Sequence, residues 1–167
     1  MKLDFTTALN KPESEFDFAF EWECDSGLFE SVPHKPNGNG LVETKYKSSQ
    51  DGEVTLKLSI RVPFTFVCDK CASEFEKNLF LEHTEQIKPD WVDDYDGITY
   101  DSNGEMDIDY LVHQVVLSSF PSLVLCSPNC KGLCLTCGVN KNFDTCNCDK
   151  NKIGKNNPFA DLLGLNK

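Results

Sequence analysis

Eight of the nine cysteines in this 167-residue chain fall into closely spaced pairs. A Cys-x2-Cys on a tight turn aims two sulfurs at one point, and cysteines separated by one residue share a face of an extended chain. A tetrahedral zinc site needs four thiolates about 2.3 Å from the metal. The paired cysteines therefore predict two four-thiolate sites. The pairs are Cys68 and Cys71, Cys126 and Cys130, Cys134 and Cys137, and Cys146 and Cys148.

The spacing allows more than one combination of these pairs. The preferred division makes one local site in the tail and a second site from the first two pairs. An alternative is a ribbon, in which Cys68 and Cys71 share a metal with Cys134 and Cys137. Two Zn²⁺ ions are the expected cofactors, because zinc favours thiolate ligands. Iron also binds four thiolates, but the chain offers no electron partner for it. The preferred sets are Cys68, Cys71, Cys126 and Cys130, and Cys134, Cys137, Cys146 and Cys148.

Other uses of the cysteines fit the sequence less well. The first residues show neither the apolar core of a signal peptide nor a transit-peptide composition, and no run reaches the roughly 20 apolar residues of a membrane helix. The sequence thus predicts a cytoplasmic protein without membrane contact, and disulfides do not persist in a reducing cytosol. A thioredoxin-type pair belongs at a helix start in a βαβ setting, which this chain lacks. Cys24, the ninth cysteine, is expected to be a small buried apolar residue.

The strongest periodic signal lies at residues 54–66, where apolar residues occupy every second position. Seven apolar residues at period two predict a long antiparallel-type strand with one buried face. This strand runs into Cys68 and Cys71, and residues 74–87 are typical of a return strand. The first cysteine pair is therefore expected at the tip of a hairpin. Further strands are predicted at residues 16–22 and 41–47.

A helix is predicted at residues 108–119, where apolar side chains recur at i, i+3 and i+4. Asp107 or Asp109 can cap its start, and Pro121 marks its end. No strand–helix–strand alternation accompanies it. The predicted fold class is therefore α+β: an antiparallel, strand-dominated body, either a sheet or a partly closed barrel, with one central helix and a cysteine-rich zinc-binding carboxyl-terminal segment.

The predicted domain limits follow from the position of the cysteines. Residues 1–125 form the β-rich body with the hairpin pair and the helix. Residues 126–167 form the cysteine-rich segment, which is expected to pack on the body and to end in a short helix. Asn157 would cap that helix, with Pro158 at its first position.

Two stretches of the tail carry a family resemblance. Residues 130–148 read CKGLCLTCGVNKNFDTCNC, and residues 157–165 read NPFADLLGL. Together with the strand that enters the first cysteine pair and the aspartate-led helix, they resemble the YceD family, called large ribosomal RNA subunit accumulation proteins. The resemblance covers about the last two-thirds of the chain, and it is specific because several motifs occur in order. Leu135 replaces a usual Pro and Lys141 a usual Leu, and neither is a predicted ligand.

The resemblance implies a bacterial cytoplasmic or plastid factor needed for normal levels of large-subunit ribosomal RNA. It implies no known enzymatic activity, and the sequence shows no nucleophile–base arrangement, so we expect neither catalytic residues nor a small-molecule substrate. It also implies that the hairpin cysteine pair belongs to the common core of the family, while the tail is an extension that some members lack.

The charge of the chain is unevenly distributed. A formal net charge of -11 argues against unspecific binding of the whole chain to nucleic acid or membranes. Residues 127–167 nevertheless carry six Lys against three Asp, whereas the other residues carry ten Lys and Arg against 24 acids. Such a tail can contact RNA phosphates, although each four-thiolate zinc site adds a formal charge of about -2. The candidate RNA-contacting residues are Lys131, Lys141, Lys150, Lys152 and Lys155.

Two functions are consistent with these features. The first is a non-enzymatic zinc-binding factor that supports large-subunit ribosomal RNA accumulation or processing and ribosome biogenesis, by binding precursor RNA or a ribosomal assembly protein. The alternative is an acidic scaffold that holds a basic ribosomal protein or an RNA-processing enzyme without touching RNA. A thiol oxidoreductase is a third hypothesis, and it would leave the cysteine pairs as metal-free dithiols.

Overall fold

The computed structural model describes residues 1–30, 33–92 and 97–148. The chain forms two compact units. The sheet unit comprises Met1–Phe66 and Glu76–Ser122, and the cysteine unit comprises Val67–Phe75 and Leu123–Lys167. Cys68 and Cys71 thus belong to the same unit as the other cysteine pairs. The domain limit predicted at residue 125 had placed these two cysteines in the β-rich body instead. The helix predicted near the carboxyl end lies outside the described residues.

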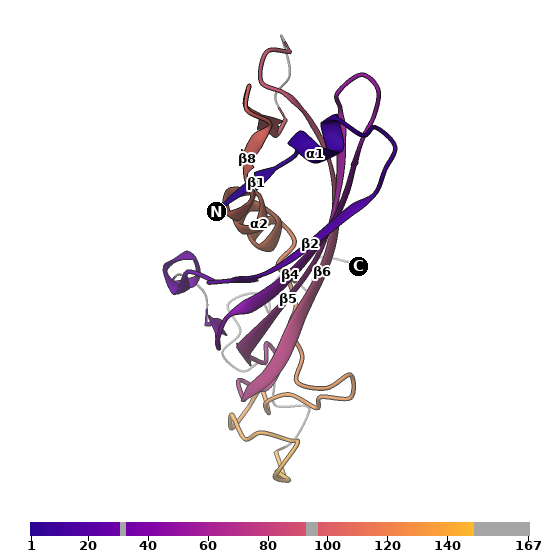
Figure 1. The fold of residues 1–167 in the computed structure, drawn as a ribbon. Coiled ribbons are helices and arrows are strands. Elements are labelled where there is room, and N and C mark those ends of the chain that lie inside the picture. The colour runs from indigo at the N-terminus through magenta and orange to yellow at the C-terminus, as the bar shows by residue number, and fades with distance from the viewer. Residues whose placement is uncertain (31–32, 93–96, 149–167) are drawn as a thin grey trace, which may run out of the picture. The chain divides into compact units, whose positions relative to one another are not determined.

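The framework of the sheet unit is an open, mostly antiparallel sheet (Figure 1). Its strand order is β2-β4-β5-β6-β7, and β3 pairs with β5 beside this path. The β2/β4 and β4/β5 pairs are antiparallel, and β6/β7 is parallel. Within the described ranges the path does not close, so the α+β class is confirmed as a sheet rather than a barrel. The strands are β2 (Phe16–Trp22), β3 (Lys35–Pro36), β4 (Gly40–Ser48), β5 (Val54–Val67), β6 (Glu74–Pro89) and β7 (Thr99–Tyr100).

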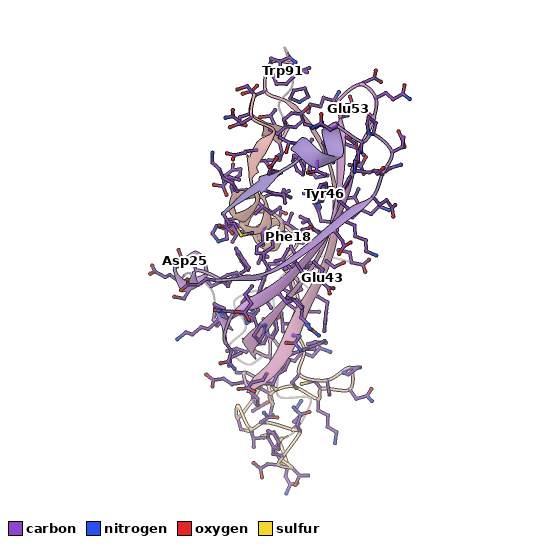
Figure 2. The ribbon with its side chains drawn as sticks, viewed as in Figure 1. Phe18, Asp25, Glu43, Tyr46, Glu53 and Trp91 are labelled. Carbon is purple, nitrogen blue, oxygen red and sulfur yellow. The ribbon has the colours of Figure 1, made fainter. Side chains whose placement is uncertain are left out.

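The alternating segment at residues 54–66 forms most of β5. Its seven apolar side chains are buried, and the residues between them are exposed or half-buried. β2 pairs with β4 along its whole length, with Phe18 opposite Thr44. Because successive side chains of a strand point to opposite faces, Phe18 and Glu43, both labelled in Figure 2, lie on opposite faces of this sheet. The apolar core therefore lies on one face, and a charged surface lies on the other.

Several short elements complete the sheet unit. A second, two-stranded antiparallel sheet joins β1 (Lys2–Asp4) to β8 (Glu105–Asp107). A four-residue helix, α1 (Thr6–Leu9), follows β1, and a 3-10 turn, η1 (Ser26–Phe29), follows β2. Neither was predicted, because so few residues cannot show a helical period. None of the helices in the described ranges has the length and apolar character needed to span a bilayer.

The predicted central helix is α2 (Ile108–Ser118), which begins after the N-cap residue Asp107. The Asp107 carboxylate accepts hydrogen bonds from the backbone N–H groups of Asp109 and Tyr110, at 3.1 and 3.3 Å. These N–H groups have no partner within the helix, so the cap stabilises its first turn. The predicted apolar face is buried; it consists of Ile108, Leu111, Val112, Val115 and Val116.

Replacing this cap with Asp107→Ala is expected to lower the free energy of unfolding by about 1 kcal/mol. The Asp107→Asn variant keeps a side-chain acceptor and should remain close to wild type. Urea denaturation followed by circular dichroism measures both variants. An equal loss in the two would show that the charge of Asp107, rather than its capping bonds, is what stabilises the helix.

Candidate metal centre

The first cysteine pair lies on the tight turn between β5 and β6. The Cys68 N–H donates to the Ser73 carbonyl at 2.9 Å, and the Ala72 N–H donates to the Cys68 carbonyl at 2.8 Å. Ala72 has a φ of 54°, in the left-handed region that residues with a Cβ rarely adopt. The turn buries both thiols, since Cys68 and Cys71 are only 1% and 3% exposed.

Backbone contacts within the cysteine unit bring the second pair to this turn. The Asp69 N–H donates to the Val124 carbonyl at 2.9 Å, and the Val124 N–H donates back to Asp69 Oδ2 at 2.5 Å. This exchange fixes the chain two residues before Cys126. The Cys130 N–H then bonds to the Ser127 carbonyl at 3.1 Å, which turns the chain between the two cysteines.

The four thiols of this hairpin set (Cys68, Cys71, Cys126 and Cys130) have the spacing of a tetrahedral site. The sulfur atoms of Cys68 and Cys130 are 3.8 Å apart, and those of Cys71 and Cys126 are 3.7 Å apart. Four sulfurs placed about 2.3 Å from a central ion in a tetrahedron lie about 3.8 Å from one another. These contacts are much longer than a disulfide of roughly 2.05 Å, and all nine cysteines are free.

The tail set (Cys134, Cys137, Cys146 and Cys148) forms a second group. Its ligand sulfurs also lie within 4.8 Å of one another. The Gly138 N–H donates to the Cys134 carbonyl, and the Cys134 N–H donates to the Val139 carbonyl, both at 2.8 Å. Gly138 has a φ of 74°, so this knuckle uses the left-handed conformation that glycine adopts without strain. The bend aims the Cys134 and Cys137 thiols at one point.

The two sets differ in their surroundings. In the hairpin set, Cys68, Cys71 and Cys130 form a buried cluster against which Phe75 and Leu125 pack. In the tail set only Cys134 is buried, and Cys137 is exposed. A metal ion in the hairpin set would therefore be part of a small core, whereas one in the tail set would hold a surface loop together.

One thiol in each set ionises easily. Hydrogen bonds from the side chain and backbone of Ser73 lower the pKa of Cys71 to about 6. Backbone N–H groups of Cys137 and Thr136 lower the pKa of Cys134 to about 6. Both thiols are therefore largely thiolates at neutral pH, which is the form that binds metal.

Another thiol in each set resists ionisation. Burial and the neighbouring thiols of the hairpin set raise the pKa of Cys126 to about 12. Hydrogen bonding to Cys137, together with burial, raises the pKa of Cys148 to about 12. Thiolates repel one another at this spacing. The thiolates of Cys71 and Cys134 therefore help to keep the thiols of Cys126 and Cys148 protonated. A bound dication removes this repulsion, and its thiol ligands are then all deprotonated.

The eight paired cysteines thus lie in the two sets of four that the preferred division predicted. The described residues do not group the thiols as the alternative ribbon requires. Cys24 is half-buried in the sheet unit, outside both sets, and burial raises its pKa to about 11. Lys131 and Lys141 are exposed on the cysteine unit. The other candidate lysines, Lys150, Lys152 and Lys155, lie outside the described residues.

Three polar residues beside the thiols were not predicted. Ser73 acts on Cys71, and Asn142 donates to the sulfur of Cys130 at 3.3 Å. Asn140 donates to the backbone carbonyl of Cys71 at 3.3 Å. The sequence hints at Asn140 and Asn142 only through their spacing, since the two asparagines are separated by one residue in the tail. That spacing does not reveal which thiols their side chains reach.

The comparisons with known proteins give one match. The family model described as "Large ribosomal RNA subunit accumulation protein YceD" matches residues 56–166, more than half of the chain. Searches of curated proteins and of solved structures found no match. The matched range contains both cysteine sets and most of β5, the long strand that leads into the first cysteine pair. The chain therefore belongs to the YceD family.

Proposed function

We propose that this chain is a non-enzymatic, cytoplasmic zinc-binding factor that supports large-subunit ribosomal RNA accumulation and ribosome biogenesis. The family description names this ribosomal RNA role. The observation that carries the proposal is the pair of four-cysteine sets within the range that the family model matches. The metal is proposed to hold the cysteine unit in the shape that its partner recognises.

The ligand sets support zinc in a structural role. Each set offers four sulfur ligands, and zinc takes four such ligands in a closed tetrahedral site. A catalytic zinc keeps one position open for water or substrate, and a four-cysteine set leaves none. This argues for a non-enzymatic role and against a thiol oxidoreductase, which needs an accessible free dithiol. Iron fits the same ligands, and metal analysis distinguishes the two.

The proposed partner is a large-subunit precursor, contacted through its RNA or through an assembly protein. Lys131 and Lys141 are exposed on the cysteine unit, where they can meet phosphate. A second candidate function, an acidic scaffold for a basic ribosomal protein or a processing enzyme, is favoured by the 24 acids against ten Lys and Arg in residues 1–126. Such an excess of negative charge attracts basic partners over long range.

A pull-down of the tagged full chain from native lysate, split with and without ribonuclease, tests the proposal. Large-subunit precursor RNA is expected in the untreated sample, together with ribosomal proteins. The charge-reversed variant Lys131→Glu with Lys141→Glu should lose RNA if the cysteine unit contacts phosphate. The matched control is Lys45→Glu with Lys57→Glu, which reverses two exposed lysines of the sheet unit.

The outcomes separate the candidate functions. If the protein partners vanish after nuclease and the tail variant loses RNA, the chain binds RNA. If a basic ribosomal protein or nuclease persists without RNA, the acidic scaffold is the correct function. If neither large-subunit RNA nor a ribosomal protein is enriched, the proposed role is wrong.

A further inference from the structure

Asn140 and Asn142 belong to the tail loop by sequence but contact the hairpin set. Both lie between Cys137 and Cys146, which are ligands of the tail set. Their side-chain amides nevertheless reach the turn that carries Cys71 and the sulfur of Cys130. All of these residues belong to the cysteine unit. The loop between two ligands of one set therefore supplies polar groups to the other set.

Asn142 contacts a ligand atom directly. Its Nδ2 donates to Cys130 Sγ at 3.3 Å, while its Oδ1 accepts from the Lys131 N–H at 2.8 Å. The Oδ1 contact holds the amide so that its N–H group faces the sulfur. A hydrogen bond to a thiolate stabilises the negative charge that a metal requires, and such outer contacts orient the ligands of metal sites.

Asn140 acts one step further from the sulfur atoms. Its Nδ2 donates to Ser73 Oγ at 2.9 Å and to the Cys71 carbonyl at 3.3 Å. With this amide as donor, the Ser73 hydroxyl keeps its own proton for its hydrogen bond to the Cys71 thiol. The Asn140 Oδ1 accepts from both the backbone N and the Nδ2 of Asn142, at 3.0 and 2.9 Å. The two amides thus form one connected network.

The tail knuckle holds this network in place. Leu133 and Asn140 form an antiparallel bridge that closes the loop carrying Cys134 and Cys137. Beside this bridge, the Leu133 N–H donates to the Lys70 carbonyl on the hairpin turn at 2.9 Å. Gly132 has a φ of 73°, and a Cβ there would lie 3.0 Å from the same carbonyl. The knuckle of the tail set is therefore seated on the turn of the hairpin set.

We propose that Asn140 and Asn142 are positioning residues of the hairpin set, and that they couple metal binding at the two sets. A metal in the tail set orders the knuckle, which places both amides against the hairpin thiols and raises the affinity there. Coupling between two binding events is reciprocal, so a metal in the hairpin set raises the affinity of the tail set by the same factor. This inference rests on the proposed metal binding.

The direct test is Asn142→Asp in the full chain, titrated with Zn²⁺ against a chromophoric chelator. Aspartate keeps the shape but replaces the donor with an acceptor, so the affinity of one of the two sites should fall about 10–100-fold. In the Co²⁺-substituted protein, the sulfur-to-metal charge-transfer band should shift, because Cys130 has lost its N–H donor. The control is Asn78→Asp, which changes an exposed asparagine of the sheet unit and should alter neither readout.

The coupling has its own test. Cys137→Ser with Cys148→Ser removes the tail set, and Cys71→Ser with Cys126→Ser removes the hairpin set. In each double variant, the Zn²⁺ affinity of the remaining set should be lower than that of the same set in the intact protein, and the factor of decrease should be equal for the two sets. Adding Asn142→Asp should make that factor smaller.

The two proposals fail in different ways. A wild-type chain that binds no metal would overturn the proposed metal binding. A wild-type chain that binds two ions, with affinities and a Co²⁺ spectrum that Asn142→Asp leaves unchanged, would overturn the positioning role. Unchanged affinity of each set when the other is removed would overturn the coupling.

Discussion

Cys71→Ser is expected to reduce the bound metal from two ions per chain to one and to unfold much of the cysteine unit. Cys71 is one of four ligands of the hairpin set, it is 3% exposed, and its sulfur lies 3.7 Å from that of Cys126. A structural zinc ion contributes roughly 10–16 kcal/mol of apparent binding free energy in small peptides. Within residues 67–75 and 123–148, the part of this unit that the structure describes, only Phe75 and Leu125 add apolar side chains to the buried cluster around the set, so the metal is expected to supply most of its stability.

Elemental analysis of the purified chain and amide hydrogen exchange measure this effect. Exchange should accelerate at residues 67–75 and 123–133, which contain the hairpin set and the backbone bonds around it. The matched control is Cys24→Ser, since Cys24 is the one cysteine outside both sets. It should keep both ions and normal exchange in the cysteine unit. Two retained ions in Cys71→Ser would contradict the four-cysteine assignment.

Phe64→Ala is expected to lower the free energy of unfolding of the sheet unit by about 3–5 kcal/mol. Phe64 is fully buried on β5, and its ring centroid lies 5.1 Å from that of Phe29, 5.3 Å from Phe66 and 5.5 Å from Phe120. Removing the ring leaves a cavity among rigid aromatic neighbours, which cannot collapse to fill it. The lost aromatic pair contacts add to the cost of the cavity.

Phe80→Ala is the matched control for this prediction. Phe80 lies on β6 of the same unit, but 65% of its surface is exposed. Its removal should change stability by no more than about 0.5 kcal/mol. Urea titration followed by tryptophan fluorescence compares the two variants, because Trp22 is 2% exposed and reports on unfolding of the core, whereas Trp91 is already 62% exposed. Equal effects of the two substitutions would mean that the core is not on the face assigned to it.

The sheet unit shows which parts of the fold local sequence can predict. The alternation at residues 54–66 and the cap at Asp107 are signals that a few neighbouring residues carry by themselves. The pairing of β1 with β8 has no such signal, because its partners Leu3 and Met106 lie far apart in the chain. The parallel partner β7 has only two residues, which is too short for any periodic pattern.

For the metal centre too, local sequence predicted one part and tertiary contacts decided the other. The close spacing of the cysteines predicted pairs of ligands, because two thiols on one turn are brought together by local geometry. The spacing left open whether Cys68 and Cys71 share a site with Cys126 and Cys130 or with the first tail pair. The contacts between Asp69 and Val124 decide this, since they place Cys126 beside the hairpin turn.

The sequence by itself determined the long strands, the central helix and the ligand pairs of this protein, because periodicity, capping and cysteine spacing act between near neighbours. Only the tertiary structure decided how the pairs combine, how deeply each set is buried, and that the tail amides of Asn140 and Asn142 serve the hairpin set. These features depend on contacts between segments that are distant in sequence. Such contacts form only when the folded backbone brings the segments together, and no local pattern of residues specifies them.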